Sequence, residues 1–212
     1  MINTIVTGLV IFHAQFNHPR SSYLRKPFLK AHHRIQVQSP IAYSKMATQT
    51  PITRETLTTA TKSLCTAFST SAQLETVLET FTHNPAPQIH EHGLQCLAPF
   101  LGRTFTGRDG ARDYFTRLNE CLGIKEMVFD DEKEWVVDER CMAVNLRGRA
   151  KFSAKGSGEE WEEVFAYRIS LAEQADGRSK GEVKVQGYEV WADTGAAYLA
   201  MRGMLGMVSG DM

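Results

Sequence analysis

The sequence predicts an α+β domain in which three N-terminal helices pack on a strongly curved antiparallel sheet, a cone-shaped roll of the cystatin type. Two observations predict this class. Apolar residues recur at helical spacing between residues 53 and 122, and they alternate with a period of two from residue 124 to residue 191. The 212 residues, 42% of them hydrophobic and 23% charged, are enough for one such domain with its own core.

Apolar stripes and helix-end signals predict the helices of the first half of the domain. A helix is expected over residues 53–69, with Thr53 as its N-cap, and a second over 71–82, ended by the prolines of residues 84–87. A short strand follows at 88–92, and residues 94–105 are expected to be a loop with a short strand. A third helix begins at residues 107–110 and ends before Gly123.

Alternation of apolar and polar residues predicts the strands. Strands are expected at 124–130 and 134–138, then a long hairpin around a turn at 155–158, and a final strand at 182–191. One register of the hairpin pairs apolar residues on one face and sets Lys151 against Glu162 on the other. The apolar-face pairs are Phe152–Trp161, Ala150–Glu163, Gly148–Phe165, Leu146–Tyr167 and Val144–Ile169.

The chain is expected to comprise three regions: a basic segment at residues 1–52, the domain at 53–202 and a flexible tail at 203–212. The first acidic residue is Glu55, and residues 55–212 carry 24 acidic against 17 basic residues. An acid-free basic segment is typical of targeting sequences, but a segment that is disordered, or not translated because the chain starts at Met46, is the simpler interpretation. A cytoplasmic protein is expected, or a mitochondrial one if the segment is a presequence.

Composition excludes several classes of protein. A formal net charge of zero argues against a strongly basic nucleic-acid binder, and the apolar stretch 5–12 is too short to span a membrane. The four cysteines form no CxxC pair, which leaves zinc-ribbon and thioredoxin-type sites unsupported. Phosphate-binding glycine loops and the GxSxG nucleophile motif are absent as well.

The order of elements and several local motifs resemble the nuclear-transport-factor-2-like superfamily, especially its SnoaL-like fungal members. The matching segments are residues 89–93, 105–115 and 188–193. The resemblance implies a pocket in the mouth of a cone, and often a homodimer, here through the outer face of the sheet. Relatives include ketosteroid isomerases, polyketide cyclases and scytalone dehydratases. The isomerase constellation is not carried over, because Phe165 occupies the position of its oxyanion-binding acid and Phe68 is the nearest match to its tyrosine.

The strand at 88–92 holds the densest titratable cluster. His90 and His92 face one way and Glu91 the other. Relatives place a general-base carboxylate at about this point, and the match falls on Glu91 or His92. Histidine suits proton transfer near neutral pH, so His92 with His90 is the expected catalytic choice. No third metal ligand is evident, and no metal is expected.

Glu163 is the other candidate, because it lies among aromatic residues on the apolar face. A carboxylate there would be desolvated and its pKa raised, which makes it a usable acid or base. A structural role, paired with an arginine, is the alternative. Substrate-binding side chains are expected among the aromatic residues Tyr114, Phe115, Trp161, Phe165, Tyr167 and Trp191.

The sequence leaves two functions open. One is a cofactor-independent cyclase, dehydratase or isomerase that acts on a small apolar, oxygenated molecule, with His92 and His90 or Glu163 moving the proton. The other is a non-catalytic ligand-binding or dimerising domain with the same pocket. An adaptor role as in nuclear transport is least expected. The two leading functions differ in whether at least two titratable groups converge on one cavity.

Overall fold

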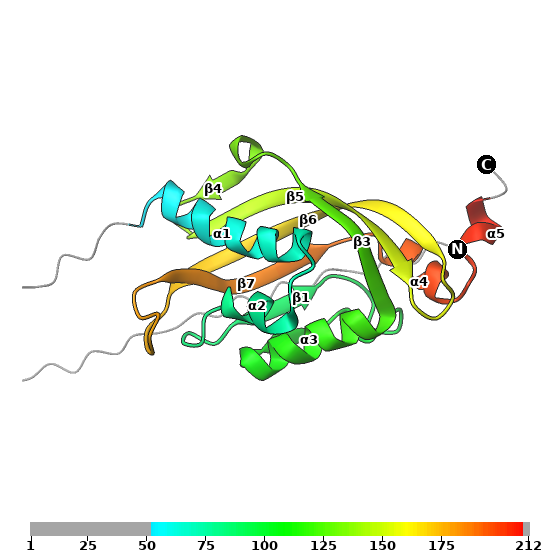
Figure 1. The fold of residues 1–212 in the computed structure, drawn as a ribbon, viewed down its shortest axis with the longest axis horizontal. Coiled ribbons are helices and arrows are strands. Elements are labelled where there is room, and N and C mark those ends of the chain that lie inside the picture. The colour runs from blue at the N-terminus through cyan, green and yellow to red at the C-terminus, as the bar shows by residue number, and fades with distance from the viewer. Residues whose placement is uncertain (1–51, 210–212) are drawn as a thin grey trace, which may run out of the picture. The chain divides into compact units, whose positions relative to one another are not determined.

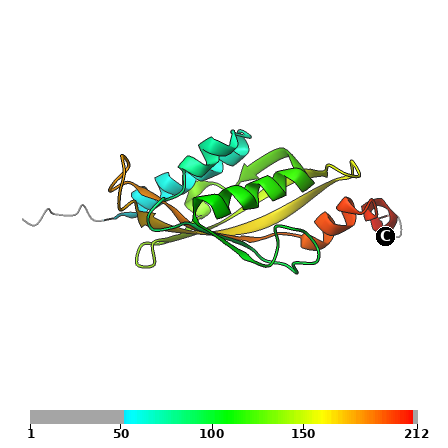
Figure 2. The ribbon, with the colours of Figure 1, turned by 90° about the horizontal axis from the view of Figure 1, so that it is seen from below.

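The helices and the sheet form two layers. The computed structural model describes residues 52–209, all within one compact unit. The helices α1, α2 and α3 lie on one face of a curved, open sheet (Figures 1 and 2). The mixed α+β class is therefore confirmed. The predictions for the basic N-terminal segment fall outside the described residues.

The helix α1 spans Arg54–Ser69, and its N-cap is the predicted one, since the backbone N–H of Thr56 donates to Thr53 Oγ1 at 3.4 Å. The helix α2 spans only Leu74–Glu79, fewer residues than expected. Ser71 has a left-handed φ of 50°, which interrupts the helical path, and Phe81 forms a β-bridge with Val185. Tertiary contacts therefore shorten a helix whose apolar stripe continues further.

The helix α3 spans Gly107–Cys121 and leads directly into the strand β3, Leu122–Phe129. Its buried residues are Ala111, Tyr114 and Phe115. A short 3₁₀ turn at Glu132–Glu134 precedes β4, Val136–Asp138. The stripe of α3 therefore faces the sheet, as amphipathic spacing predicts.

The sheet order is β2-β1-β7-β6-β5-β3, with β4 also pairing with β5. The other strands are β1 Gln88–Glu91, β2 Thr104–Thr106, β5 Ala143–Ala154, β6 Glu160–Glu173 and β7 Val183–Trp191. The prediction of a purely antiparallel sheet is wrong at one place, because β1 pairs with β7 in parallel. No hairpin joins these two strands, so no turn dictates their relative direction.

The β5–β6 hairpin has the predicted register at every pair, from Val144 opposite Ile169 to Phe152 opposite Trp161. Along β5 the apolar residues are buried, and Asn145, Arg147 and Arg149 are exposed. Gly148 is required by packing, since a Cβ there would lie 2.5 Å from Cζ of Phe165. The apolar wall of the sheet is thus set by two-residue alternation.

Two helices follow the sheet: α4, Thr194–Met201, and α5, Leu205–Ser209. Asp193 is the N-cap of α4, as predicted, and its Oδ1 accepts the backbone N–H of Ala196 at 3.0 Å. The helix α5 was not predicted; the backbone N–H of Leu205 donates to Glu159 Oε2 at 3.0 Å. Between residues 52 and 209 no helix combines the length and hydropathy of a membrane span.

Candidate functional site

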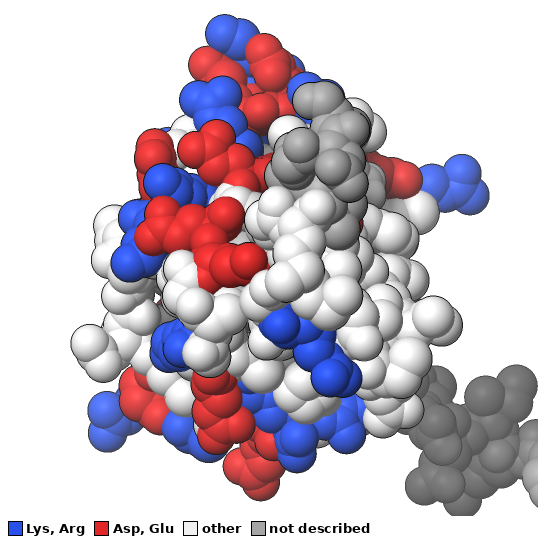
Figure 3. Space-filling model, turned by 90° about the vertical axis from the view of Figure 1, so that its right-hand side faces the viewer, with Lys and Arg blue, Asp and Glu red and all other residues white. Residues whose placement is uncertain are grey.

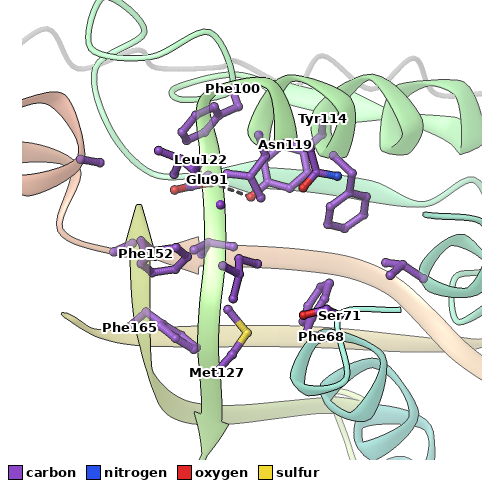
Figure 4. Close-up of a pocket in the computed structure, with 18 of the residues that line it drawn as sticks. Phe68, Ser71, Glu91, Phe100, Tyr114, Asn119, Leu122, Met127, Phe152 and Phe165 are labelled. Carbon is purple, nitrogen blue, oxygen red and sulfur yellow. Dashed lines mark hydrogen bonds between the residues drawn. The ribbon is translucent and has the colours of Figure 1, made fainter. Parts of the chain in front are cut away.

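Glu91 points from β1 toward the helices. It is 6% exposed, and the hydroxyl of Tyr114 on α3 donates to its Oε2 at 2.5 Å (dashed line in Figure 4). Alternation along β1 places Ile89 and Glu91 on the buried face. Of the two alternatives from the sequence, the carboxylate and not His92 is therefore the residue directed inward.

Glu163 points inward from β6. The indole N–H of Trp161, two residues earlier on the same face, donates to its Oε2 at 2.7 Å. The register that sets Ala150 opposite Glu163 fixes this orientation. Glu163 is therefore held among aromatic side chains, as the sequence predicts.

Both carboxyl groups line one cavity of about 420 Å³ between the sheet, the helices α1–α3 and the start of α4. Figure 4 shows Phe68, Phe100, Phe152, Phe165 and Met127 around it. The volume lies in the range of small-molecule sites, and walls of this kind are typical of them. The other aromatic lining residues are Tyr114, Phe115, Trp161, Tyr167 and Tyr188.

Burial dominates the electrostatics of the cavity. Burial raises the pKa of Glu91 to about 7. Two smaller effects act on the same pKa: the hydrogen bond from Tyr114 lowers it, and the charge of Glu163 raises it. Burial also raises the pKa of Glu163 to about 7, against the lowering effect of Trp161, and the Asp193 carboxylate raises it further. Both carboxyls can therefore exchange protons near neutral pH.

The tyrosine of this site keeps its proton. Burial and the neighbouring Glu91 carboxylate raise the pKa of Tyr114 well above its usual value. Its hydroxyl is therefore a hydrogen-bond donor to Glu91 throughout the physiological pH range.

The structure does not bring His92 and Glu163 together at the cavity. His90 and His92 lie on the opposite face of β1 from Glu91, with ring centroids 4.6 Å apart, and neither lines the cavity. His92 stacks on Trp191 at 4.2 Å, and its Nε2 lies 3.7 Å from Glu189 Oε2. Period-two alternation separates these imidazoles from the apolar face.

The prediction that Trp191 binds substrate is also not supported by its position. Trp191 is 42% exposed on the outer face of β7, beside His92. Alternation along β7 buries Tyr188 and Val190 instead, and both line the cavity. The other five predicted aromatic residues, Tyr114, Phe115, Trp161, Phe165 and Tyr167, do line it.

Sequence reasoning missed Tyr188 as a site residue and left Glu91 undecided. A signal existed for each: Ile89 shares a face with Glu91, and Val190 shares one with Tyr188. Phe100 and Met127 had no comparable signal, because Phe100 lies in an irregular segment and Met127 follows a register shift between Ile124 and Glu126.

Within residues 52–209, no group of three or more His, Cys, Asp or Glu side chains is arranged to hold a metal ion.

Comparison with solved structures identifies the architecture. An NTF2-like protein of unknown function from Burkholderia pseudomallei superposes with a TM-score of 0.52 at 14% identity, covering 69% of this chain and 97% of that one. The chain has the nuclear-transport-factor-2-like fold. No family model and no curated protein matches the sequence.

Two further structures share this NTF2-like fold. A proposed isomerase from Bacillus subtilis has a TM-score of 0.54 at 9% identity, covering 70% of this chain and 94% of its own. A proposed isomerase from Rhodopseudomonas palustris has a TM-score of 0.50 at 12% identity, covering 72% and 99%. At such identities the likeness concerns the NTF2-like fold and not the reaction.

Proposed function

We propose that this NTF2-like domain is an enzyme of the isomerase, dehydratase or cyclase type. It binds a small apolar, oxygenated molecule in the cavity and moves a proton on it by general acid–base catalysis. Glu91 and Glu163 are the catalytic pair, and the aromatic walls hold the substrate. The observation that carries this proposal is that two carboxyl groups with pKa values of about 7 line the same apolar cavity.

The two carboxyls titrate as a pair. The charge of Glu163 raises the pKa of Glu91, so ionisation of one disfavours ionisation of the other. Near neutral pH the form with one proton on the pair is therefore well populated. That form contains one acid and one base within one cavity.

The proposed step uses this form. The ionised carboxylate takes a proton from a carbon next to the substrate carbonyl, and the protonated carboxyl gives its proton to the carbonyl oxygen. The product is an enol. The carboxyl that was ionised is now protonated, and the carboxyl that was protonated is now ionised. In a substrate with a β,γ double bond the product is a dienol, and return of the proton at the γ carbon gives the conjugated isomer. In a substrate with a β-hydroxyl, loss of that hydroxyl with a proton, as water, gives a dehydrated product.

Hydrogen–deuterium exchange tests this step without knowledge of the natural substrate. Benzylacetone is incubated with the protein in D₂O, and deuterium next to its carbonyl is followed by NMR. We expect exchange with the wild type and a loss of about 100-fold or more in Glu91→Gln and Glu163→Gln, the usual size of an acid–base contribution.

His92→Gln is the matched control, because His92 lies on the outer face and should leave exchange unchanged. Loss of exchange in His92→Gln, with normal exchange in both glutamine variants, would contradict the assignment. Binding of benzylacetone without any exchange would favour the ligand-binding function.

A further inference from the structure

The charged side chains that line the cavity are unevenly distributed. Three are acidic, Glu91, Glu163 and Asp193, and Lys155 is the one cation among the lining residues. In the part of the chain that the structure describes, no ion pair involves any of these four side chains. Lys155 therefore retains a positive charge that no carboxylate offsets.

Lys155 is fixed at the opening of the cavity. It follows β5 in the hairpin turn, its backbone N–H donates to the carbonyl of Cys121 at 2.9 Å, and its Nζ donates to the carbonyl of Asn119. Both Lys155 and Asn119 are exposed and line the cavity. Lys155 and Asn119 are thus neighbours where the cavity meets solvent, joined by the bond from the ammonium to the Asn119 backbone carbonyl.

The neighbouring lysines behave differently. Lys125 and Lys151 both pair with Glu160, at 3.8 and 3.0 Å, and neither lines the cavity. These two lysines are therefore each paired with a carboxylate, whereas Lys155 is not. Figure 3 views this end of the molecule, where charged residues gather toward the rims and uncharged residues occupy much of the centre.

An apolar stretch separates Lys155 from the catalytic pair. Four residue steps along β5 lead from Ala150, which pairs with Glu163, to Ala154, at the end of the strand. At 3.3 Å a residue this is about 13 Å. The wall along it includes the stacked rings of Phe152 and Trp161, with centroids 5.5 Å apart. A ligand that touches both ends must be elongated and apolar in its middle.

We propose that Lys155 and the side-chain amide of Asn119 bind the carboxylate of an elongated apolar acid whose other end reaches Glu91 and Glu163. The acid head group is disfavoured at the inner end, because the ionised member of the Glu91/Glu163 pair repels it. Asp193 forms no ion pair with Lys155, and its Oδ1 accepts the N–H of Ala196. This inference names the substrate class of the proposed reaction and rests on the same cavity.

Binding of matched probes tests the head-group site separately from catalysis. Phenylhexanoate and phenylhexanol, which differ in charge at one end, are titrated at neutral pH by calorimetry. We expect the wild type to bind the acid about three- to tenfold more tightly than the alcohol, the range of a partly exposed charge-assisted contact. Added salt should reduce this preference.

The variants separate recognition from a structural role at the end of α3. Lys155→Met should abolish the preference and leave alcohol binding unchanged, whereas Lys155→Arg and the control Lys151→Met should keep it. The proposal is overturned if Lys155→Met keeps the preference and only lowers the melting temperature, or if the wild type binds neither probe.

The double variant Glu91→Gln/Glu163→Gln should keep the preference and lose deuterium exchange. A wild type that prefers the acid but exchanges no deuterium would refute the proposed catalysis and leave the carboxylate site standing.

Discussion

The carboxyl group of Glu163 owes its environment to strand register. The sequence already placed it on the apolar face, since one pairing of the hairpin satisfied both faces at once. Glu91 could not be chosen over His92 in the same way, because β1 has four residues and only Ile89 indicates its inner face. Side-chain partners such as Tyr114 lie far away in the chain, and only the fold brings them together.

Trp161→Phe tests how the environment of Glu163 is tuned. In the wild type, the hydrogen bond from the Trp161 indole N–H lowers the pKa of Glu163. The substitution keeps an aromatic ring and removes this hydrogen bond. We expect this pKa to rise above about 7, as followed by carboxyl ¹³C NMR. Trp191→Phe is the control, because Trp191 lies on the outer face. A similar rise of the Glu163 pKa in Trp191→Phe would refute the assigned contact.

At the scale of elements, alternation predicted the long strands well and the edges of the sheet poorly. The β5–β6 pair is joined by a turn, so its direction and register follow from local sequence. The parallel pairing of β1 with β7 links segments about 100 residues apart, with no turn to specify it. The early end of α2 likewise depends on the bridge between Phe81 and Val185.

Gly148→Ala tests the packing of the hairpin. The new Cβ would lie 2.5 Å from Cζ of Phe165 and 2.9 Å from the carbonyl oxygen of Val128. We expect the free energy of unfolding to fall by about 1–3 kcal/mol, the usual cost of overpacking, in urea denaturation. Gly156→Ala, whose Cβ has no neighbour within 4 Å, should change it by much less. Equal effects would contradict the close packing of Phe165 on Gly148.

Asp193→Ala tests the start of α4. The N-cap bond to Ala196 is lost, and we expect destabilisation of about 1 kcal/mol by urea denaturation. Asp193→Asn should largely preserve the cap while removing the charge that raises the pKa of Glu163. If the two variants are equally destabilised, the cap is not what Asp193 contributes.

At the scale of the whole molecule, the cavity should make stability depend on pH. Glu91 has a folded pKa of about 7 against an ordinary value of 4.5, so the folded state binds more protons between these values. The free energy of unfolding should therefore fall as pH rises from about 5 to about 8, by about 3 kcal/mol for Glu91 alone. Urea unfolding at several pH values measures the slope.

Variants identify the source of that slope. Glu91→Gln should strongly reduce the dependence of the free energy of unfolding on pH, and Glu163→Gln should reduce it in part. Glu120→Gln, on the exposed face of α3, should leave this dependence unchanged. A slope that survives in the double variant would place the responsible groups elsewhere.

The homodimer through the outer face of the sheet remains a prediction from resemblance.

The proposed function requires that Glu91 and Glu163 share one desolvated cavity and act on each other. Titration of the glutamate carboxyls by ¹³C NMR, in the wild type and in Glu163→Gln, tests it most directly. We predict two carboxyls that titrate near pH 7 in the wild type, and a lower pKa of Glu91 once Glu163 is neutral. Titration of every glutamate below about pH 5, or a Glu91 pKa that ignores the substitution, would contradict the account.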